Sequence, residues 1–237
     1  MKETLLYEGK AKRLFQTDDP TILRVVYKDD ATALNGKRKE VFSGKGRLNN
    51  QITSLLFDYL REEGIPSHFI KAISEIEQLV KAVTVIPLEV VVRNKTAGSL
   101  SKRLGRADGE TIDPAIIEFY YKDDELDDPF INQDHIRYLK IATTAQVETI
   151  KEQALTVNQA LKKLFLRMGI ELIDFKLEFG IDTAGNVLLA DEISPDTCRL
   201  WDLETNQKLD KDVFRQNIGN LTTVYEEVLT RLQNVNH

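Results

Sequence analysis

The chain of 237 residues is long enough for one large domain, or for two modest domains around a shared cleft. Its composition, 42% hydrophobic and 30% charged, is typical of a soluble globular protein. The net charge of −6 argues against a surface that binds nucleic acid or membranes in general, although a local basic cleft remains compatible with it.

The few cysteines and histidines narrow the chemistry further. Cys198 is the single cysteine, which excludes an intrachain disulfide and a cysteine-based metal site and fits a reducing compartment. No histidine lies near it in sequence, so we expect a plain buried or semi-buried thiol. His68, His135 and His237 lack the spacing of zinc ligands. The N-terminus has no apolar signal core, and no apolar run approaches membrane length, so we expect a cytoplasmic protein.

Residues 4–28 contain three short apolar runs separated by turn residues, which predicts a meander of three strands. Gly9 lies at the first bend, and Lys10 and Lys12 follow it. A glycine backbone can approach a phosphate closely, and lysines supply point charges, so this bend suits a cover over a triphosphate. Taken alone, however, the pattern fits an ordinary hairpin with solubilising lysines better.

The next segment predicts a helix that packs on the core. Residues 29–37 form a polar loop by composition, and residues 43–50 form a second loop rich in glycine and basic residues. The helical pattern covers residues 51–63, with one apolar stripe, and Gly64 ends it.

Two more strands, 68–73 and 76–83, lead to Pro87, which marks a candidate boundary between lobes. An apolar connection at such a boundary can hold an adenine through backbone N–H and C=O groups. Arg93 ends the next buried strand and Ser99 follows shortly after, so both side chains can point at an anion. An ordinary loop between a strand and a helix explains the spacing about equally well.

The second half alternates irregular and helical segments. Residues 101–145 are irregular apart from a strand at 116–122 and an acidic loop after it. A long amphipathic helix is predicted over 146–168 and should pack on the hairpin that follows. A last helix is predicted over 212–232, with Arg215 near its start.

That hairpin carries the most unusual charges. Asp174, Lys176 and Glu178 alternate with aromatic and aliphatic residues and share one face of a strand. A turn over residues 183–186 sets Glu178 directly across from Asp191 on the returning strand. Two facing carboxylates beside a lysine can hold Mg²⁺, which takes one or two protein carboxylates together with substrate phosphates. The alternative is an ordinary hairpin whose charged face is solvated.

The residues after the hairpin suggest an anion site. Ser194 and Pro195 are typical of the N-cap and the first position of a helix. The start of a helix attracts anions, and Arg199, one turn later, can clamp a carboxylate or a phosphate.

Five motifs in this order resemble one family closely, that of the SAICAR synthetases (phosphoribosylaminoimidazole-succinocarboxamide synthases). The resemblance covers residues 6–232 and rests on the segments YEGKAKRLF, KGRLNN, VIPLEVVVRNKTAGSL, DFKLEFG and LADEISPDTCRLWD. It implies an α+β fold with two lobes: an antiparallel-sheet N-terminal lobe (1–85) that covers ATP, and a larger α/β C-terminal lobe (86–237) that binds substrates and metal. The cleft between them would be similar to those of protein kinases and ATP-grasp enzymes.

The resemblance also implies an activity. Members of the family are ATP-dependent ligases that join L-aspartate to the carboxylate of carboxyaminoimidazole ribonucleotide (CAIR), giving SAICAR, ADP and phosphate in purine biosynthesis. A carboxylate is a poor acylating agent, so its phosphorylation to an acyl phosphate would supply a good leaving group. Lysines and Mg²⁺ would stabilise charge on the transferred phosphoryl group. The family further suggests a homodimer.

Site residues follow from the resemblance position by position. At ATP it places Gly9, Lys10, Ala11 and Lys12, the backbone of Lys81 and Val83, Glu89 near the ribose, and Lys122 at the phosphates. At Mg²⁺ it places Glu178 and Asp191. Around CAIR and aspartate it places Arg93, Ser99, Asp174, Lys176, Ser194, Asp196, Arg199 and Arg215. Direct catalytic roles fall to Lys12, Asp174, Lys176 and Arg199.

Two alternatives remain at this point. A kinase would share the glycine–lysine turn and the paired acids, but the chain has no His-Arg-Asp catalytic loop, and Asp174 is followed by Phe-Lys rather than Phe-Gly. A nucleotide sensor without catalysis would not need Lys12 or the acidic pair.

Overall fold

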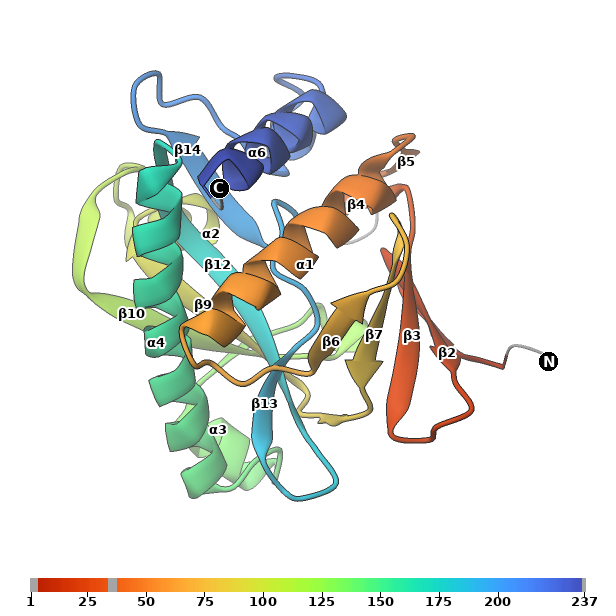
Figure 1. The fold of residues 1–237 in the computed structure, drawn as a ribbon. Coiled ribbons are helices and arrows are strands. Elements are labelled where there is room, and N and C mark those ends of the chain that lie inside the picture. Colours follow the sequence, from red (N-terminus) through yellow and green to blue (C-terminus); the bar gives the residue numbers. More distant parts are fainter. Residues whose placement is uncertain (1–3, 34–37, 236–237) are drawn as a thin grey trace.

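The computed structural model describes residues 4–33 and 38–235, which form two large antiparallel sheets and a two-stranded one, with helices packed against the large sheets (Figure 1). The five-stranded sheet has the order β1 (Leu5–Glu8), β2 (Lys12–Gln16), β3 (Ile22–Tyr27), β7 (Glu77–Lys81) and β6 (Phe69–Ala72). The seven-stranded sheet has the order β11 (Phe130–Ile131), β10 (Thr111–Tyr121), β9 (Leu88–Lys95), β12 (Ile170–Ile181) and β13 (Val187–Ala190), while β14 (Cys198–Asp202) and β8 (Thr84–Val85) also pair with β12.

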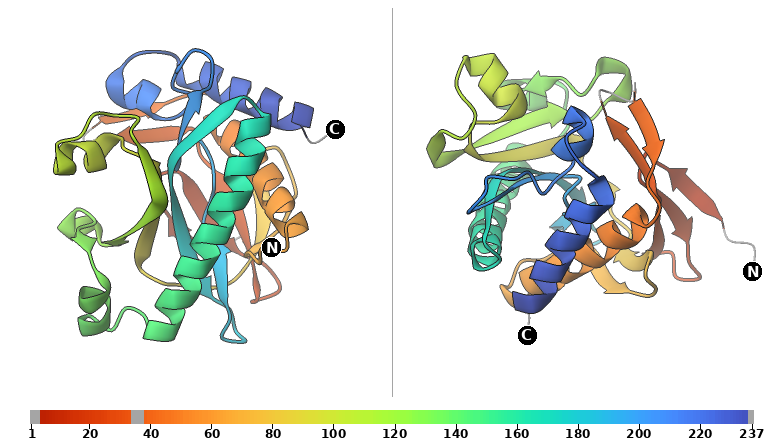
Figure 2. Two further views of the ribbon diagram at one scale, coloured as in Figure 1. Left: turned by 90° about the vertical axis from the view of Figure 1, so that its left-hand side faces the viewer. Right: turned by 90° about the horizontal axis from the view of Figure 1, so that it is seen from above.

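The five-stranded sheet confirms the predicted meander and the two strands after the first helix. Along β3, Leu23, Val25 and Tyr27 face inward and Arg24 faces outward, as the period of a strand requires. Helix α1 (Lys45–Glu62) packs on this sheet, contacting β3, β6 and β7, and it also lies beside α6 (Leu221–Val235) (Figure 2).

The seven-stranded sheet is covered by α4 (Thr144–Arg167), which contacts β9, β12 and β13. The predicted helix and its packing on the hairpin are therefore confirmed. Along β12, Phe175, Leu177 and Phe179 are buried in the core, which leaves the alternate residues for the opposite face. One large apolar core connects α1, α4 and α6 with β9 and β12.

The two sheets are joined by short links. Only residues 82 and 83 separate β7 from β8, so the chain passes directly from one sheet to the other. A parallel bridge pairs Ser67 with Leu189, beside β6 and within β13. Gly180 permits a third close contact, because a Cβ atom there would lie 2.5 Å from a methyl carbon of Val83.

Helix α1 begins at Lys45, six residues earlier than predicted. A residue distant in sequence, Asp29, accepts hydrogen bonds from the N–H groups at its start. The carboxylate of Asp29 accepts hydrogen bonds from the N–H groups of Gly44 (3.2 Å) and Gly46 (2.9 Å). Gly46 also lets the helix approach β3, since a Cβ atom would lie 2.9 Å from the carbonyl oxygen of Tyr27. The predicted polar loop over 29–37 is instead a hairpin of β4 (Asp30–Ala33) and β5 (Arg38–Val41); residues 34–37 lie outside the described residues.

Three other segments differ from the prediction. Residues 101–145 are more regular than expected, with β10, β11, a short 3-10 turn η1 (Asp124–Leu126), α3 (Gln133–Tyr138) and the end of α2 (Gly98–Leu104). The last predicted helix is two helices, α5 (Asp212–Gln216) and α6, because Asn217 adopts a left-handed conformation between them. The helix predicted at Ser194 is one turn, since β14 begins at Cys198 and pairs with β12.

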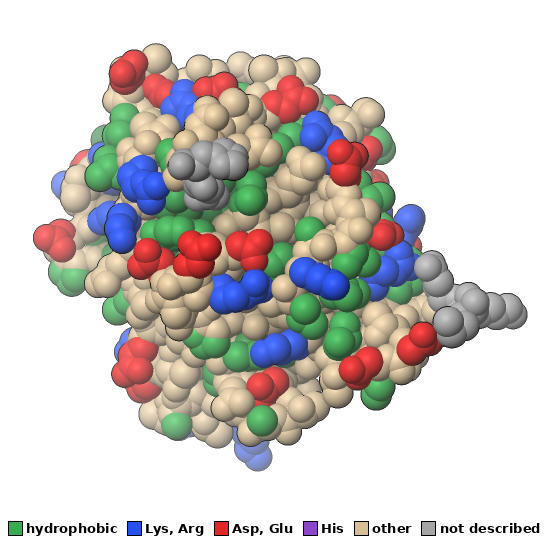
Figure 3. Space-filling model, in the orientation of Figure 1, with side chains coloured by type: hydrophobic (Ala, Val, Ile, Leu, Met, Phe, Trp, Pro, Cys, Tyr) green, Lys and Arg blue, Asp and Glu red, His purple; other side chains and the backbone are tan. Residues whose placement is uncertain are grey.

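Two surface properties follow from the described residues. None of their helices is both long enough and apolar enough to cross a membrane. On the face seen in Figure 3, basic and acidic side chains are interspersed over the helices and strands of Figure 1.

Candidate active site

The site is built on the charged face of β12. Asp174 lies in register with Arg93 of β9 on one side and with Arg199 of β14 on the other, so three charged residues form a row across three strands. The Asp174 carboxylate accepts from Arg93 Nη1 at 2.6 Å and from Arg199 Nη1 at 2.9 Å. The sheet register therefore places one carboxylate between two guanidinium groups.

This row continues at both ends. Arg93 also contacts Glu118 at 2.9 Å, and Arg199 Nε donates to Asp212 at 3.0 Å, which in turn accepts from Arg215 at 2.6 Å. Burial disfavours the charge on Arg93, but the carboxylates beside it raise its pKa above the usual value. The same balance raises the pKa of Arg199. Both side chains therefore stay charged and fixed in place.

Further along β12, Lys176 connects the two predicted metal ligands. Its Nζ lies 2.6 Å from Glu178 Oε1 and 4.0 Å from Asp191 Oδ2. The predicted register is nevertheless wrong by one residue, because Glu178 faces Ala190 and not Asp191. Asp182 accepts from two turn N–H groups and lengthens the turn by one residue.

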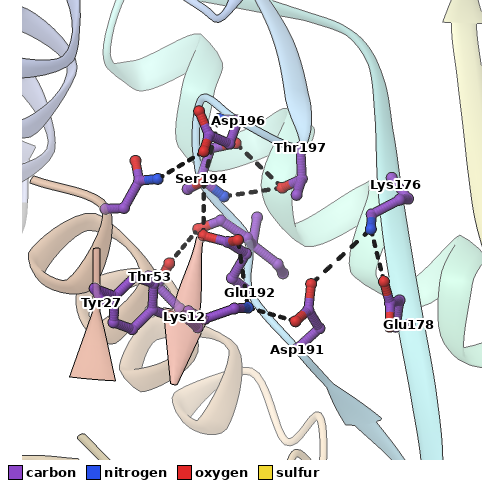
Figure 4. Close-up of polar contacts among 12 residues, drawn as sticks. Lys12, Tyr27, Thr53, Lys176, Glu178, Asp191, Glu192, Ser194, Asp196 and Thr197 are labelled. Atoms are coloured by element: carbon purple, nitrogen blue, oxygen red, sulfur yellow. Dashed lines mark hydrogen bonds and ion pairs between the residues drawn. The ribbon is translucent and has the colours of Figure 1, made fainter. Parts of the chain in front are cut away.

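Asp191 reaches the site by a backbone kink instead. Its φ of 60° is in the left-handed region, which is costly for aspartate and ends β13 just before it. The kink brings its carboxylate to Lys12, which also lies 3.3 Å from Glu192 (Figure 4). Glu178 and Asp191 therefore both lie near Lys176, but Asp191 is brought there by the kink and not by the predicted strand pairing.

Charge pairing keeps these groups ionised. Burial opposes protonation of Lys12, but Asp191 and Glu192 outweigh it and raise its pKa. Burial alone would raise the pKa of Asp191, whereas the nearby lysines, Lys12 first, hold it well below its usual range. Glu178 is ion-paired with Lys122 in addition to Lys176. The region therefore contains three carboxylates and three ammonium groups in alternating positions.

Three adjoining cavities open around these residues. The apolar cavity, of about 390 Å³, is walled by Leu14, Leu23, Val25, Val80, Val83, Val85 and Ala190, with His68 and Lys81. The glycine-turn cavity, of about 700 Å³, is lined by Gly9, Lys10, Ala11, Lys28 and Asp30 among others. These two cavities share Tyr7, Lys12, Leu14, Lys122, Glu178 and Asp191.

The arginine cavity, of about 530 Å³, contains the charged row on β12. Its lining includes Arg93, Ser99, Asp174, Asp196, Arg199, Lys211 and Arg215. It shares Lys10, Glu89 and Lys176 with the glycine-turn cavity, so the two are continuous.

All but one of the residues predicted for the site line at least one cavity. The exception is Ser194, which is 1% exposed and lies behind the wall. Its hydroxyl donates to Glu192 at 3.2 Å and accepts from the N–H of Asp196 at 3.1 Å, so it holds the turn together. Asp196 itself is held by Lys45 at 2.6 Å and by the hydroxyl of Tyr225 at 2.5 Å.

Sequence reasoning missed several lining residues, notably His68, Glu192 and Lys211. Glu192 adjoins Asp191, and the run of two acids was a usable signal for it. Lys211 comes from a loop before α5 and has no local pattern. Cys198 is buried, as expected, and burial raises the pKa of its thiol, which excludes a ready nucleophile.

An apolar cavity and a lysine-lined cavity meet at two carboxylates, and an arginine-lined cavity is continuous with the second of them. This arrangement defines an enzyme that uses a nucleotide to act on anionic substrates.

Comparisons with known proteins narrow this class to one family. The family model for SAICAR synthetase matches residues 5–232. The phosphoribosylaminoimidazole-succinocarboxamide synthase of Listeria innocua is 72% identical over 99% of each chain. The solved structure of the synthase from Ehrlichia chaffeensis has a TM-score of 0.95 at 48% identity and covers 97% of this chain and 98% of its own.

A further solved structure, a SAICAR synthetase in complex with ADP, has a TM-score of 0.93 at 48% identity and covers 96% of this chain and 97% of its own. The chain therefore belongs to the SAICAR synthetase family. It is an ATP-dependent ligase of purine biosynthesis, and the expected α+β fold is confirmed. The kinase and nucleotide-sensor alternatives are thereby set aside.

Proposed function

We propose that the enzyme joins L-aspartate to the carboxylate of CAIR, with ATP as the source of energy. The observation that carries this proposal is the strand β12, which presents Asp174 to the arginine cavity and Glu178 to the two nucleotide-sized cavities. A phosphoryl donor and its acceptor can therefore meet beside Lys176, which lies between these two residues on the same face.

The nucleotide would occupy two of the cavities. The apolar cavity suits a purine base, with the backbone of Lys81 and Val83 at its edge and Glu89 near the ribose. The phosphates would lie in the glycine-turn cavity against Gly9, Lys10 and Ala11. There Lys12 and Lys122 would balance their charge, since both ammonium groups border both cavities.

Glu178 and Asp191 fit a site for Mg²⁺. Both lie near one ammonium group, that of Lys176, and this supports a position for a cation between them. Among the described residues no group of three or more His, Cys, Asp or Glu side chains could hold a metal. Two carboxylates plus phosphate oxygens match the preference of Mg²⁺, which when bound would neutralise charge on the phosphates.

The arginine cavity would bind CAIR and aspartate. Arg93, Arg199 and Arg215 offer guanidinium groups to substrate carboxylates or phosphate, and Ser99 and Asp196 offer further polar contacts. The carboxylate of Asp174 is already engaged by two arginines, so we assign it a positioning role. Lys176 would contact the reacting oxygens.

The proposed reaction has two steps. An oxygen of the CAIR carboxylate attacks the γ-phosphorus of ATP, its bond to phosphorus forms, and the bond to ADP breaks. The aspartate amine then attacks the acyl carbon, loses a proton, and expels phosphate. Lys12 and Lys176 would stabilise negative charge on the transferred group.

Isotope labelling tests this order of bonds. CAIR labelled with ¹⁸O in its carboxylate should yield labelled inorganic phosphate as SAICAR forms. Unlabelled phosphate with full conversion would contradict the acyl phosphate. Omitting ATP, CAIR or aspartate in turn should abolish phosphate release in each case. Formation of ADP and a stable phosphorylated product without aspartate would point to a kinase-like activity instead.

We further propose that residues 1–85 act as the ATP-covering lobe and residues 86–237 as the substrate lobe, and that the enzyme is a homodimer. The order of the two sheets along the chain supports the first point, and the family supports the second. Light scattering after size-exclusion chromatography measures the assembly directly.

A further inference from the structure

Lys211 lies in the wall of the arginine cavity, just before α5. Its backbone is held at two points: the N–H donates to the carbonyl of Pro195 at 3.0 Å, and its own carbonyl accepts from the N–H of Arg215 at 3.0 Å. The second hydrogen bond spans one helical turn, so the side chains of Lys211 and Arg215 share one face. The backbone therefore places two cationic side chains together at the cavity, whatever the Lys211 ammonium group contacts.

The ammonium group of Lys211 keeps its donors free. Its one ion pair within residues 4–33 and 38–235, to Asp196, is 3.7 Å long and thus beyond hydrogen-bonding distance. The Asp196 carboxylate is already engaged, because its Oδ2 lies 2.6 Å from Nζ of Lys45 and accepts from Asn49 at 3.0 Å, while its Oδ1 accepts from Tyr225 at 2.5 Å. Three N–H donors of Lys211 therefore remain for a ligand.

This ammonium group can also be reached from the cavity. The side chain of Lys211 is 13% exposed, whereas that of Lys45, on the other side of Asp196, is 0% exposed. Among the described residues, the enclosed side-chain atoms that lack a hydrogen bond include Nζ of Lys45 but not Nζ of Lys211. Of the three cavities, Lys211 lines the arginine cavity alone, so its free donors face that cavity.

The surroundings of Lys211 carry more positive than negative charge. Lys45 and Lys211 share the carboxylate of Asp196, and the guanidinium group of Arg215 is close by. Burial lowers the pKa of Lys211; Asp196 opposes this shift, and Lys45 and Arg215 add to it. A bound anion would offset both the burial and the repulsion between these cations.

We propose that Lys211 binds an oxyanion of the substrates, a carboxylate or a phosphate, next to Arg215. The inference rests on the proposed binding of CAIR and aspartate in the arginine cavity. Free donors, access from the cavity and uncompensated positive charge all support it. An ammonium group is a compact charge with three rotatable donors, so it suits a single oxygen, whereas the guanidinium groups beside it suit a pair of oxygens.

The binding of two ligands tests the contact and identifies the oxyanion. CAIR has a phosphate and a free carboxylate; in SAICAR that carboxylate has become an amide, and the aspartyl half brings further carboxylates. Isothermal titration with ADP and Mg²⁺ present and inorganic phosphate absent measures both dissociation constants without turnover. Lys211→Met removes the charge at a similar side-chain length and should weaken at least one ligand about 10-fold.

The pattern of the loss distinguishes the sources. Equal weakening of both ligands assigns the contact to the phosphate, weakening of SAICAR alone assigns it to the aspartyl half, and weakening of CAIR alone assigns it to the CAIR carboxylate. Unchanged constants for both ligands would overturn the proposal. If the unmodified enzyme binds neither ligand, the proposed function fails; if it binds both and Lys211→Met binds them equally well, only the role of Lys211 fails.

Three controls separate a contact from a general defect. The dissociation constant of ADP alone should not change in Lys211→Met, and a loss as large as that for the substrates would overturn the proposal. Lys211→Arg keeps the charge and should recover most of the affinity; a loss equal to that of Lys211→Met would count against the contact. Lys208→Met removes a charge from the same loop, where Lys208 contacts Gln216 at 2.9 Å outside all three cavities. It should change neither constant, and an equal loss would show that only the overall charge matters.

Discussion

The arginine cavity and the apolar cavity differ in whether the buried polar groups beside them are paired. In the arginine cavity, Arg93, Asp174 and Arg199 pair with one another, so the charges are held in position before any substrate arrives. Behind the wall of the apolar cavity, Nδ1 of His68 is buried and has no hydrogen-bond partner within residues 4–33 and 38–235. Internal pairing gives rigidity and a fixed geometry, whereas a buried unpaired atom costs free energy of folding.

The largest effect is expected at Glu178 and Asp191, the carboxylates that the apolar and glycine-turn cavities share. Glu178→Gln or Asp191→Asn removes an anionic group from the proposed Mg²⁺ site, so turnover should fall about 1000-fold while the fold is kept. Steady-state rates over a Mg²⁺ titration measure this, with circular dichroism to check the fold. Asp134→Asn, at an exposed ion pair, is the control. Near-normal rates at saturating Mg²⁺ would contradict the assignment.

A smaller effect, confined to one cavity, is expected at Arg199. Arg199→Lys keeps the charge but loses the planar fork that contacts Asp174 and Asp212. We expect kcat/KM for CAIR or aspartate to fall about 100-fold, with little change in the dissociation constant of ADP. Equal weakening of all three ligands would indicate a folding defect and would remove the contrast between the cavities.

The smallest effect, counted per pH unit, is a pH dependence of the free energy of unfolding that belongs to the apolar cavity. The pKa of His68 is depressed from 6.5 to about 3 in the folded state. Its contribution to the free energy of unfolding is therefore complete above pH 6.5 and is lost as the pH falls from 6.5 towards 3. The loss is at most about 1.4 kcal/mol per pH unit.

His68→Gln removes this titration, so urea unfolding should give a shallower decrease for the variant over the same pH window. The difference between the two proteins isolates His68 from carboxylates that titrate in the same range, such as Asp191. Parallel curves would show that the imidazole titrates normally and is not buried as the structure has it.

The parts of the molecule that follow local rules could be predicted from the sequence. Alternation along β12 separated Asp174, Lys176 and Glu178 from the core residues correctly, and a 3.6-residue period located α4. The start of α1 could not be predicted, because Asp29 caps it from sixteen residues before the helix begins. Likewise, the side chain of Asp182 lengthens a turn and shifts the register by one residue, which residue type alone does not reveal.

The same distinction between local patterns and tertiary contacts applies to the residues of the site. Motifs and resemblance predicted the residues on the strands, whereas His68 and Lys211 were missed because tertiary packing brings them to the cavities. Ser194 and Pro195 favour a helix locally, yet the pairing of β14 with β12 overrides that preference. The sequence around Ser194 and Pro195 does not show that the residues after them pair with β12 as a strand.

The links between the sheets have a mechanical consequence. The chain crosses between β7 and β8 in two residues, and the Ser67–Leu189 bridge and the Gly180–Val83 contact lie near that crossing. Helix α1 adds a further attachment, since it packs on the five-stranded sheet and also lies beside α6. The bend at Gly9 lies at the opposite end of β2 and β3 from the crossing, and there the ion pairs of Lys12 with Asp191 and Glu192 tie the sheet to the reacting groups. The five-stranded sheet is therefore held at both ends, by backbone at the crossing and by charge at the site.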